Sequence, residues 1–127
     1  MSVLVVEDHT DVAVTLAMYL ELVGFRVRVA ADGEAGIRSG LADPPDAVVC
    51  DIGLPKKDGF QVAGELIAGL PRRPLLIAVT GYGEDEMRER GKAAGFDHYL
   101  LKPVDPRAIE ALLRTRGPGG VKDLRRP

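Results

Sequence analysis

The chain has 127 residues, the size of one ordinary domain, and its 46% hydrophobic content suffices for one core. A formal net charge of −2, with 5% aromatic residues and no Trp, offers no basic groove lined by aromatic side chains, so we expect no direct binding to nucleic acid. The single Cys excludes an internal disulfide, and the lack of a signal peptide or a membrane-length apolar run predicts a soluble cytoplasmic protein with no membrane partner.

Short apolar runs alternate with stretches of helical period along the chain, which is the pattern of a parallel α/β sheet. In chain order, the predicted elements are a strand at residues 3–6, a helix at 10–23, a strand at 25–29, a turn at Asp32-Gly33, a helix at 34–41, a strand at 47–50, a loop at 56–59, a helix at 60–70, a strand at 75–79, a helix at 84–94, a strand at 98–101 and a last helix opening with Pro106. Thr10 or Asp11 is expected to cap the first helix, Gly24 to end it, and Asp105 to cap the last helix.

Five strands alternating with five helices predict a doubly wound, five-stranded parallel sheet, because crossovers between parallel strands are right-handed. Ligands bind such sheets beyond the carboxyl ends of the strands. We expect residues 1–116 to form this domain and residues 117–127, which open with Gly-Pro-Gly-Gly, to be a flexible tail.

Polar residues stand at the carboxyl ends of four predicted strands: Glu7, Asp8, Asp51, Thr80 and Lys102. Three carboxylates and one ammonium on one rim leave a local charge of about −2, which a divalent cation would neutralise. Hard oxygen ligands favour Mg²⁺, and zinc is improbable because no His or Cys is expected at the rim. His9 and His98 are expected to have no role.

A carboxylate beside bound magnesium can act as a nucleophile toward an activated phosphoryl group. The metal ion and Lys102 would neutralise charge in the transition state, and the Thr80 hydroxyl would donate a hydrogen bond to a phosphoryl oxygen. Asp51 is the favoured acceptor, because the acids after the first strand lie at a loop edge better suited to metal.

Four segments, in their order and spacing, resemble the receiver (response-regulator) domains of two-component signalling: residues 3–8 (VLVVED), 51–59 (DIGLPKKDG), 79–82 (VTGY) and 94–103 (AGFDHYLLKP). The resemblance covers roughly residues 2–115, and the residues of these segments look most like those of receivers attached to hybrid sensor kinases. It implies a flavodoxin-like fold with strand order 2-1-3-4-5.

The resemblance also implies a role for each matching residue: Glu7 and Asp8 as magnesium-binding acids, Asp51 as phosphoacceptor and metal ligand, the backbone carbonyl of Gly53 as a further metal contact, Thr80 and Tyr99 as the switch pair, Lys102 as the phosphate contact and Pro103 after a cis peptide bond. The implied cofactor is Mg²⁺ or Mn²⁺. The implied phosphodonor is a phosphohistidine of a sensor histidine kinase or a histidine phosphotransfer protein. A downstream protein partner or a covalently linked kinase would read the face formed by the fourth helix, fifth strand and fifth helix.

Three positions depart from the family pattern or tune it. Lys57 replaces a usually hydrophobic residue and, beside Lys56, makes its loop basic. Gly36 stands where a larger apolar residue is common, so the second helix is expected to be loose. Tyr82 could shield the phosphoryl group from water.

Two alternatives stay open. A Mg-dependent phosphohydrolase with an aspartyl nucleophile usually carries a second Asp two residues after the nucleophile, where this chain has Gly53, so we expect no enzymatic turnover of external substrates. A non-phosphorylated pseudo-receiver, acting only as a binding module, is disfavoured by the complete set of acids together with Thr80 and Lys102. Cys50, in an apolar run, is expected to be a buried and unreactive thiol.

Overall fold

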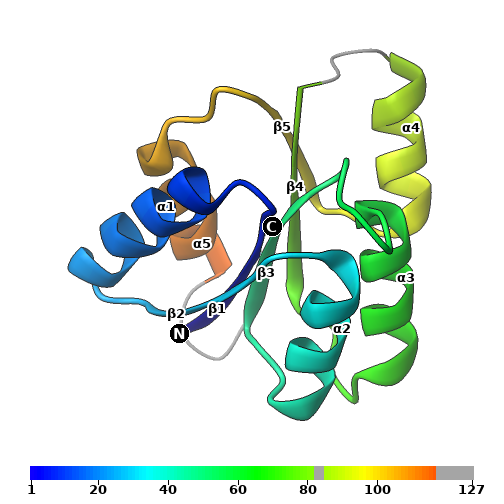
Figure 1. The fold of residues 1–127 in the computed structure, drawn as a ribbon, viewed down its shortest axis with the longest axis horizontal. Coiled ribbons are helices and arrows are strands. Elements are labelled where there is room, and N and C mark those ends of the chain that lie inside the picture. Colours follow the sequence, from blue (N-terminus) through cyan, green and yellow to red (C-terminus); the bar gives the residue numbers. More distant parts are fainter. Residues whose placement is uncertain (82–84, 117–127) are drawn as a thin grey trace.

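The computed structural model describes residues 1–81 and 85–116 and contains the predicted doubly wound sheet (Figure 1). Five parallel strands lie in the order β2-β1-β3-β4-β5, as the resemblance implies. The strands are β1 Ser2–Val6, β2 Arg26–Ala30, β3 Ala47–Asp51, β4 Leu75–Thr80 and β5 His98–Leu101. The helices are α1 Thr10–Leu22, α2 Gly33–Ala42, α3 Gly59–Gly69, α4 Asp85–Ala94 and α5 Pro106–Arg116. Tyr82 and the predicted tail at residues 117–127 lie outside the described residues.

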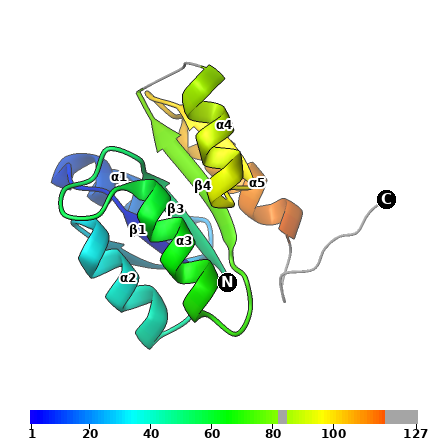
Figure 2. The ribbon, with the colours of Figure 1, turned by 90° about the vertical axis from the view of Figure 1, so that its right-hand side faces the viewer.

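Helices cover both faces of the sheet, with α1 and α5 on one face and α2, α3 and α4 on the other (Figures 1 and 2). Alternate residues of a strand point to opposite faces. Val3 and Val5 of β1 therefore pack in the cluster under α1 and α5, while Leu4 and Val6 pack in the cluster under the other three helices. All four side chains are at most 1% exposed, which explains why this strand is wholly apolar.

Side-chain caps set the first residues of α2 and α3. The Asp32 carboxylate accepts a hydrogen bond from the Ala35 backbone N–H at 2.8 Å, and Asp58 forms a reciprocal capping box with Gln61. The predicted turn at Asp32-Gly33 and the predicted loop at 56–59 are confirmed except at their last residues, because Gly33 and Gly59 are the first residues of α2 and α3, one residue earlier than expected. In each case, the carboxylate of a residue type common in turns accepts a hydrogen bond from a backbone N–H in the first turn of the helix, which has no partner within the helix.

The ends of α1 and α5 test three further cap predictions. The residue before α1 is His9, which makes no side-chain cap, so the prediction of a cap at Thr10 or Asp11 was wrong. Gly24 has a φ of +107° just beyond α1, as expected for a residue that ends a helix. Asp105 accepts a hydrogen bond from the Arg107 backbone N–H at 2.9 Å, which confirms its predicted position as the cap before α5.

Gly36 is a close-packing position in α2, contrary to the expectation of a loose helix. A Cβ added there would lie 2.9 Å from both methyl carbons of Val6, a fully buried β1 residue. Glycine lets the helix backbone approach the sheet, so the missing side chain tightens this contact. Among the described residues, no helix is long and apolar enough to cross a membrane.

Candidate functional site

The polar residues singled out in the sequence lie at the carboxyl ends of the strands. Glu7 and Asp8 directly follow β1, Asp51 is the last residue of β3, and Lys102 directly follows β5. Parallel pairing aligns these ends, because β3 lies between β1 and β4 and β4 pairs with β5. The sheet therefore brings residues that are up to 95 positions apart to one rim.

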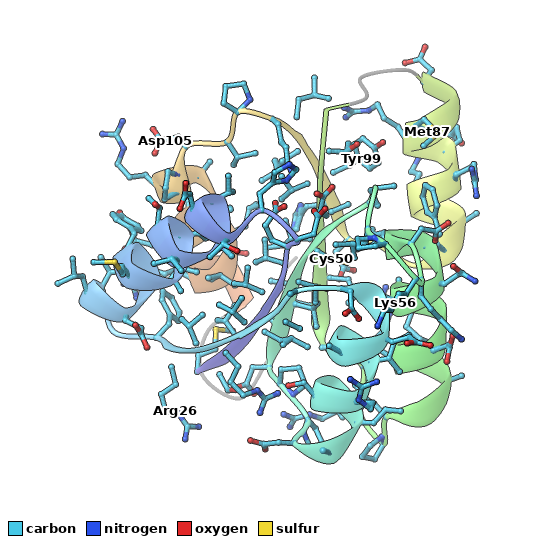
Figure 3. The ribbon with its side chains drawn as sticks, viewed as in Figure 1. Arg26, Cys50, Lys56, Met87, Tyr99 and Asp105 are labelled. Carbon is cyan, nitrogen blue, oxygen red and sulfur yellow. The ribbon has the colours of Figure 1, made fainter. Side chains whose placement is uncertain are left out.

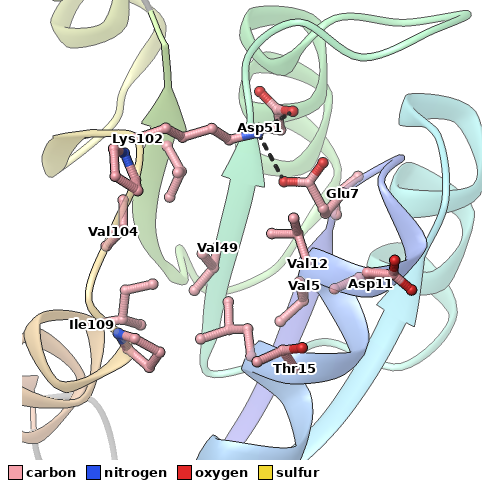
Figure 4. A pocket seen from close by; sticks show the side chains of 16 residues that line it. Val5, Glu7, Asp11, Val12, Thr15, Val49, Asp51, Lys102, Val104 and Ile109 are labelled. Atoms are coloured by element: carbon pink, nitrogen blue, oxygen red, sulfur yellow. Dashed lines mark hydrogen bonds and ion pairs between the residues drawn. The ribbon is translucent and has the colours of Figure 1, made fainter.

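Lys102 bridges two buried carboxylates at the centre of this rim (Figure 4). Its Nζ donates to Glu7 Oε1 at 3.0 Å and to Asp51 Oδ2 at 3.0 Å. Glu7 is 6% and Asp51 8% exposed, so both charges are largely removed from water. Such groups are tolerated only when they are paired or hydrogen-bonded, and Lys102 supplies that pairing.

The ammonium of Lys102 is stabilised in its charged form. Partial burial lowers the pKa of Lys102, but the hydrogen bonds to Asp51 and Glu7 and the charges of these two carboxylates outweigh this effect and raise it. The site thus keeps a permanent positive charge beside the Asp51 carboxylate.

The acids exceed the one ammonium, and their geometry suits a cation. Ligand atoms of Glu7, Asp8, His9 and Asp51 all lie within 4.8 Å of one another. Asp8 Oδ1 is buried and has no hydrogen-bond partner among the described residues, which leaves a carboxylate oxygen unsatisfied. Three carboxylates with an unsatisfied buried oxygen fit a hard divalent cation such as Mg²⁺.

His9 belongs to this group, although from the sequence we expect no role for it and no imidazole at the rim. Its Nδ1 lies 3.1 Å from Glu7 Oε2 and 3.5 Å from Asp8 Oδ1, while its side chain is 69% exposed. That expectation was wrong because the chain turns after β1 and brings His9 back over Glu7. The adjacent letters Glu-Asp-His were the signal that could have revealed it.

Thr80 and Tyr99 occupy two different places. Thr80 is 1% exposed at the end of β4, where its carbonyl oxygen accepts a hydrogen bond from the Lys102 backbone N–H at 2.7 Å. Tyr99 lies in β5 beside α4, labelled in Figure 3, with the Arg88 guanidinium 5.5 Å from its ring centroid. A Cβ added at Gly91 would lie 2.9 Å from a Tyr99 ring carbon, so the ring packs directly on the α4 backbone.

The connection between β3 and α3 positions Asp51. The Gly53 backbone N–H donates to Asp51 Oδ1 at 3.2 Å, so this carboxylate is held by Lys102 on one oxygen and by the loop on the other. The predicted basic character of the loop is offset by carboxylates. Lys57 Nζ lies 2.6 Å from Glu65, and Lys56 lies 3.9 Å from Asp32.

Two further predictions concern the residues beside the rim. The peptide bond between Lys102 and Pro103 is cis. Cys50 is fully buried, and burial raises the pKa of its thiol, which confirms the expectation of a buried group. Such a thiol carries little thiolate and reacts slowly.

Comparison with known proteins places this rim in a family context. Residues 3–114 match the sequence profile of the response regulator receiver domain. The transcriptional regulatory protein PrrA of Mycobacterium tuberculosis (strain ATCC 25618 / H37Rv) is 40% identical over 119 residues, which cover 91% of this chain and 51% of PrrA. The chain thus spans about half the length of the curated relatives it matches first.

Solved structures agree in fold. A CheY-like response regulator receiver domain protein from Methanospirillum hungatei JF-1 superposes with a TM-score of 0.80 at 28% identity, covering 88% of this chain and 89% of that one. A response regulator protein from Burkholderia pseudomallei, solved with a phosphorylated aspartic acid, a calcium ion and citrate, superposes with a TM-score of 0.82 at 28% identity, covering 91% of this chain and 67% of that one.

The relatives named above include a transcriptional regulator, so the finer likeness to receivers of hybrid kinases stays a prediction. The expectation that this chain binds no nucleic acid also stays a prediction. The strand order, the acidic rim and the match over residues 3–114 agree with one another: the chain belongs to the response regulator receiver domain family.

Proposed function

We propose that this chain accepts a phosphoryl group on Asp51 from a phosphohistidine of a sensor histidine kinase or a histidine phosphotransfer protein. The observation that carries the proposal is the Asp51 carboxylate itself, buried at the rim with Lys102 Nζ 3.0 Å away and two further acids beside it. A nucleophilic carboxylate beside fixed positive charge is the arrangement that phosphoryl transfer to an aspartate requires.

In the proposed reaction, an Asp51 oxygen forms a bond to phosphorus while the bond from phosphorus to the donor histidine nitrogen breaks. The leaving imidazole keeps the electron pair and takes up a proton. Lys102 would follow the charge onto the phosphoryl oxygens, and the Gly53 N–H already fixes the orientation of the Asp51 carboxylate. The Thr80 hydroxyl would donate to a phosphoryl oxygen.

Glu7, Asp8, Asp51 and the Gly53 carbonyl would hold Mg²⁺ or Mn²⁺ in this proposal. When bound, the ion would neutralise the excess charge of the acids and of the incoming phosphoryl group. The unsatisfied Asp8 Oδ1 supports this assignment, since a cation would give that oxygen its missing partner. The phosphorylated aspartic acid and the calcium ion in the Burkholderia pseudomallei structure support both parts of the proposal.

The proposed output is a change of the face formed by α4, β5 and α5. Thr80 ends β4 next to β5, and Tyr99 stands in β5 against α4, so a movement of Thr80 toward a phosphoryl group would alter the space beside the Tyr99 ring. A downstream protein partner or a linked kinase would read that face. We further propose that the chain turns over no external substrate, because Gly53 stands where a phosphohydrolase usually carries its second Asp.

The test is phosphorylation of the purified chain by acetyl phosphate with MgCl₂, followed by intact-mass spectrometry. Wild type should gain one phosphoryl group, and EDTA or Asp51→Asn should abolish the gain. Asp11→Asn removes the same charge from an exposed position in α1 and should label like wild type. Labelling of Asp51→Asn at the wild-type level would refute Asp51 as the acceptor.

A further inference from the structure

A cavity of about 600 Å³ lies between α1, α5 and the carboxyl half of the sheet (Figure 4). Its volume falls within the range of roughly 300–1,000 Å³ that is typical of sites for small organic ligands. Its walls are mainly apolar and come from three strands, two helices and the connection before α5. The principal apolar wall residues are Val5, Val12, Leu16, Val49, Val104 and Ile109.

Charged groups gather at the rim of this cavity. Glu7, Asp51 and Lys102 line it together, so two carboxylates meet one ammonium, a net charge of −1. In the absence of metal, the rim offers an added anion only an ammonium that already donates to two carboxylates. The charge of the rim therefore favours a cationic group in an occupant.

We propose that this cavity binds a small apolar molecule that carries one ammonium group. Its hydrocarbon part would lie against the strand valines and displace water from apolar walls, which is favourable. Its ammonium group would lie at the rim beside Glu7 and Asp51. The proposal does not rest on the proposed phosphoacceptor function, because binding requires neither metal nor phosphodonor.

Helix α1 offers a matched pair of positions for the test. Val12 and Val14 are 50% and 46% exposed, but only Val12 lines the cavity. A tryptophan at either position adds the same bulk at a half-exposed position of the same helix, but the two positions lie on opposite sides of that helix. Only Val12→Trp should place that bulk over the cavity, and neither change alters the charged rim.

The experiment titrates 4-phenylbutylamine into the ¹⁵N-labelled chain in EDTA and follows the backbone amide signals. The amine should bind with a Kd of about 1 mM or tighter, shifting signals around Val49 and Ile109. The anionic analogue 4-phenylbutanoate has the same hydrocarbon part and should bind at least about fivefold more weakly. Val12→Trp should weaken binding of the amine at least about tenfold, while Val14→Trp should bind it like wild type.

The comparison of the two probes uses the wild-type chain, so it decides the question even if a tryptophan variant does not fold. Absence of saturable binding of the amine, or equal affinity for the two probes, would overturn the proposal. Wild-type affinity in a folded Val12→Trp would overturn it too. If the signals around the cavity respond to neither probe and shift only with a histidine phosphotransfer protein, the cavity belongs to a protein-docking surface and the proposal is wrong.

Discussion

Replacing Asp8 with Asn should stabilise the metal-free protein, although Asp8 is a proposed metal ligand. The carboxylate of Asp8 lies with those of Glu7 and Asp51 in a group whose ligand atoms are within 4.8 Å of one another. Two unit charges at that distance repel by about 0.9 kcal/mol in bulk water and by about 3.5 kcal/mol at an effective dielectric constant of 20. The Asp8 side chain is 31% exposed, so solvent screening favours the lower end. We expect Asp8→Asn to raise the free energy of unfolding by about 1 kcal/mol without metal.

Magnesium should reverse the order of the two proteins. At a concentration one hundred times its Kd, a ligand that binds only the folded state stabilises wild type by about 2.7 kcal/mol. If the loss of the Asp8 carboxylate weakens the affinity about a hundredfold, the same concentration stabilises the variant by only about 0.4 kcal/mol. The variant would then be more stable than wild type in EDTA and less stable in magnesium.

Urea unfolding followed by circular dichroism, in EDTA and in MgCl₂, measures both effects. Asp11→Asn is the control, because it removes the same charge three positions along the chain at an exposed site. It should lose a few tenths of a kcal/mol through the helix dipole and keep the whole magnesium gain. A variant Asp8→Asn that is no more stable than wild type in EDTA, or that keeps the full magnesium gain, would refute the charge reasoning.

Two other substitutions test the structure by the same unfolding assay. Lys102→Met should lower the free energy of unfolding by about 1–3 kcal/mol at neutral pH, because it leaves two buried carboxylates without their partner, whereas Lys92→Met on exposed α4 should stay within about 0.5 kcal/mol. The pKa of Lys102 is higher in the folded state than in the unfolded chain. The charged Lys102 therefore stabilises the fold fully below the unfolded pKa of about 10.4, and this stabilisation is lost as the pH rises through the folded pKa. If Lys102→Met were still less stable than wild type by the same free energy above this range, the ion pairs would be contradicted. Gly36→Ala should lower the free energy of unfolding by about 1–3 kcal/mol, because the added Cβ would press on Val6. Gly64→Ala in α3, where an added Cβ meets open space, should instead raise the free energy of unfolding by up to about 1 kcal/mol. Equal effects of the two substitutions would show that the contact of α2 with β1 is looser than described.

The fold was predictable because it depends on periodicity, which is local in sequence. The wholly apolar residues 3–6 indicate a strand covered on both faces, and Val3 to Val6 are buried as that pattern requires. The cap residues were harder to assign. Aspartates such as Asp32 and Asp58 are common in turns as well as at helix N-termini. Only the direction of the following helix shows that their carboxylates accept hydrogen bonds from backbone N–H groups of its first turn.

The site was predictable where it depends on strand ends and not where it depends on loop paths. Glu7, Asp51 and Lys102 meet because parallel strands end on one rim, which the topology alone requires. The place of His9 depends on the backbone path after β1, for which the sequence has no periodic signal. The close approach behind Gly36 was missed for a related reason: an absent side chain carries no pattern, and only the position of the facing Val6 gives it meaning.

The same charge excess explains both why the rim can react and why it needs a partner. A protein with a neutral rim would be more stable, which is why we expect Asp8→Asn to raise the free energy of unfolding. Such a rim would, however, have no excess negative charge to attract a cation beside Asp51. Lys102 pairs with one oxygen of Glu7 and one of Asp51, but Asp8 Oδ1 has no hydrogen-bond partner among the residues described. Any positive group that reaches the rim relieves this imbalance, whether a metal ion or the ammonium of a ligand in the neighbouring cavity. The two should therefore compete, and magnesium should weaken binding of the amine to the extent that it neutralises the rim.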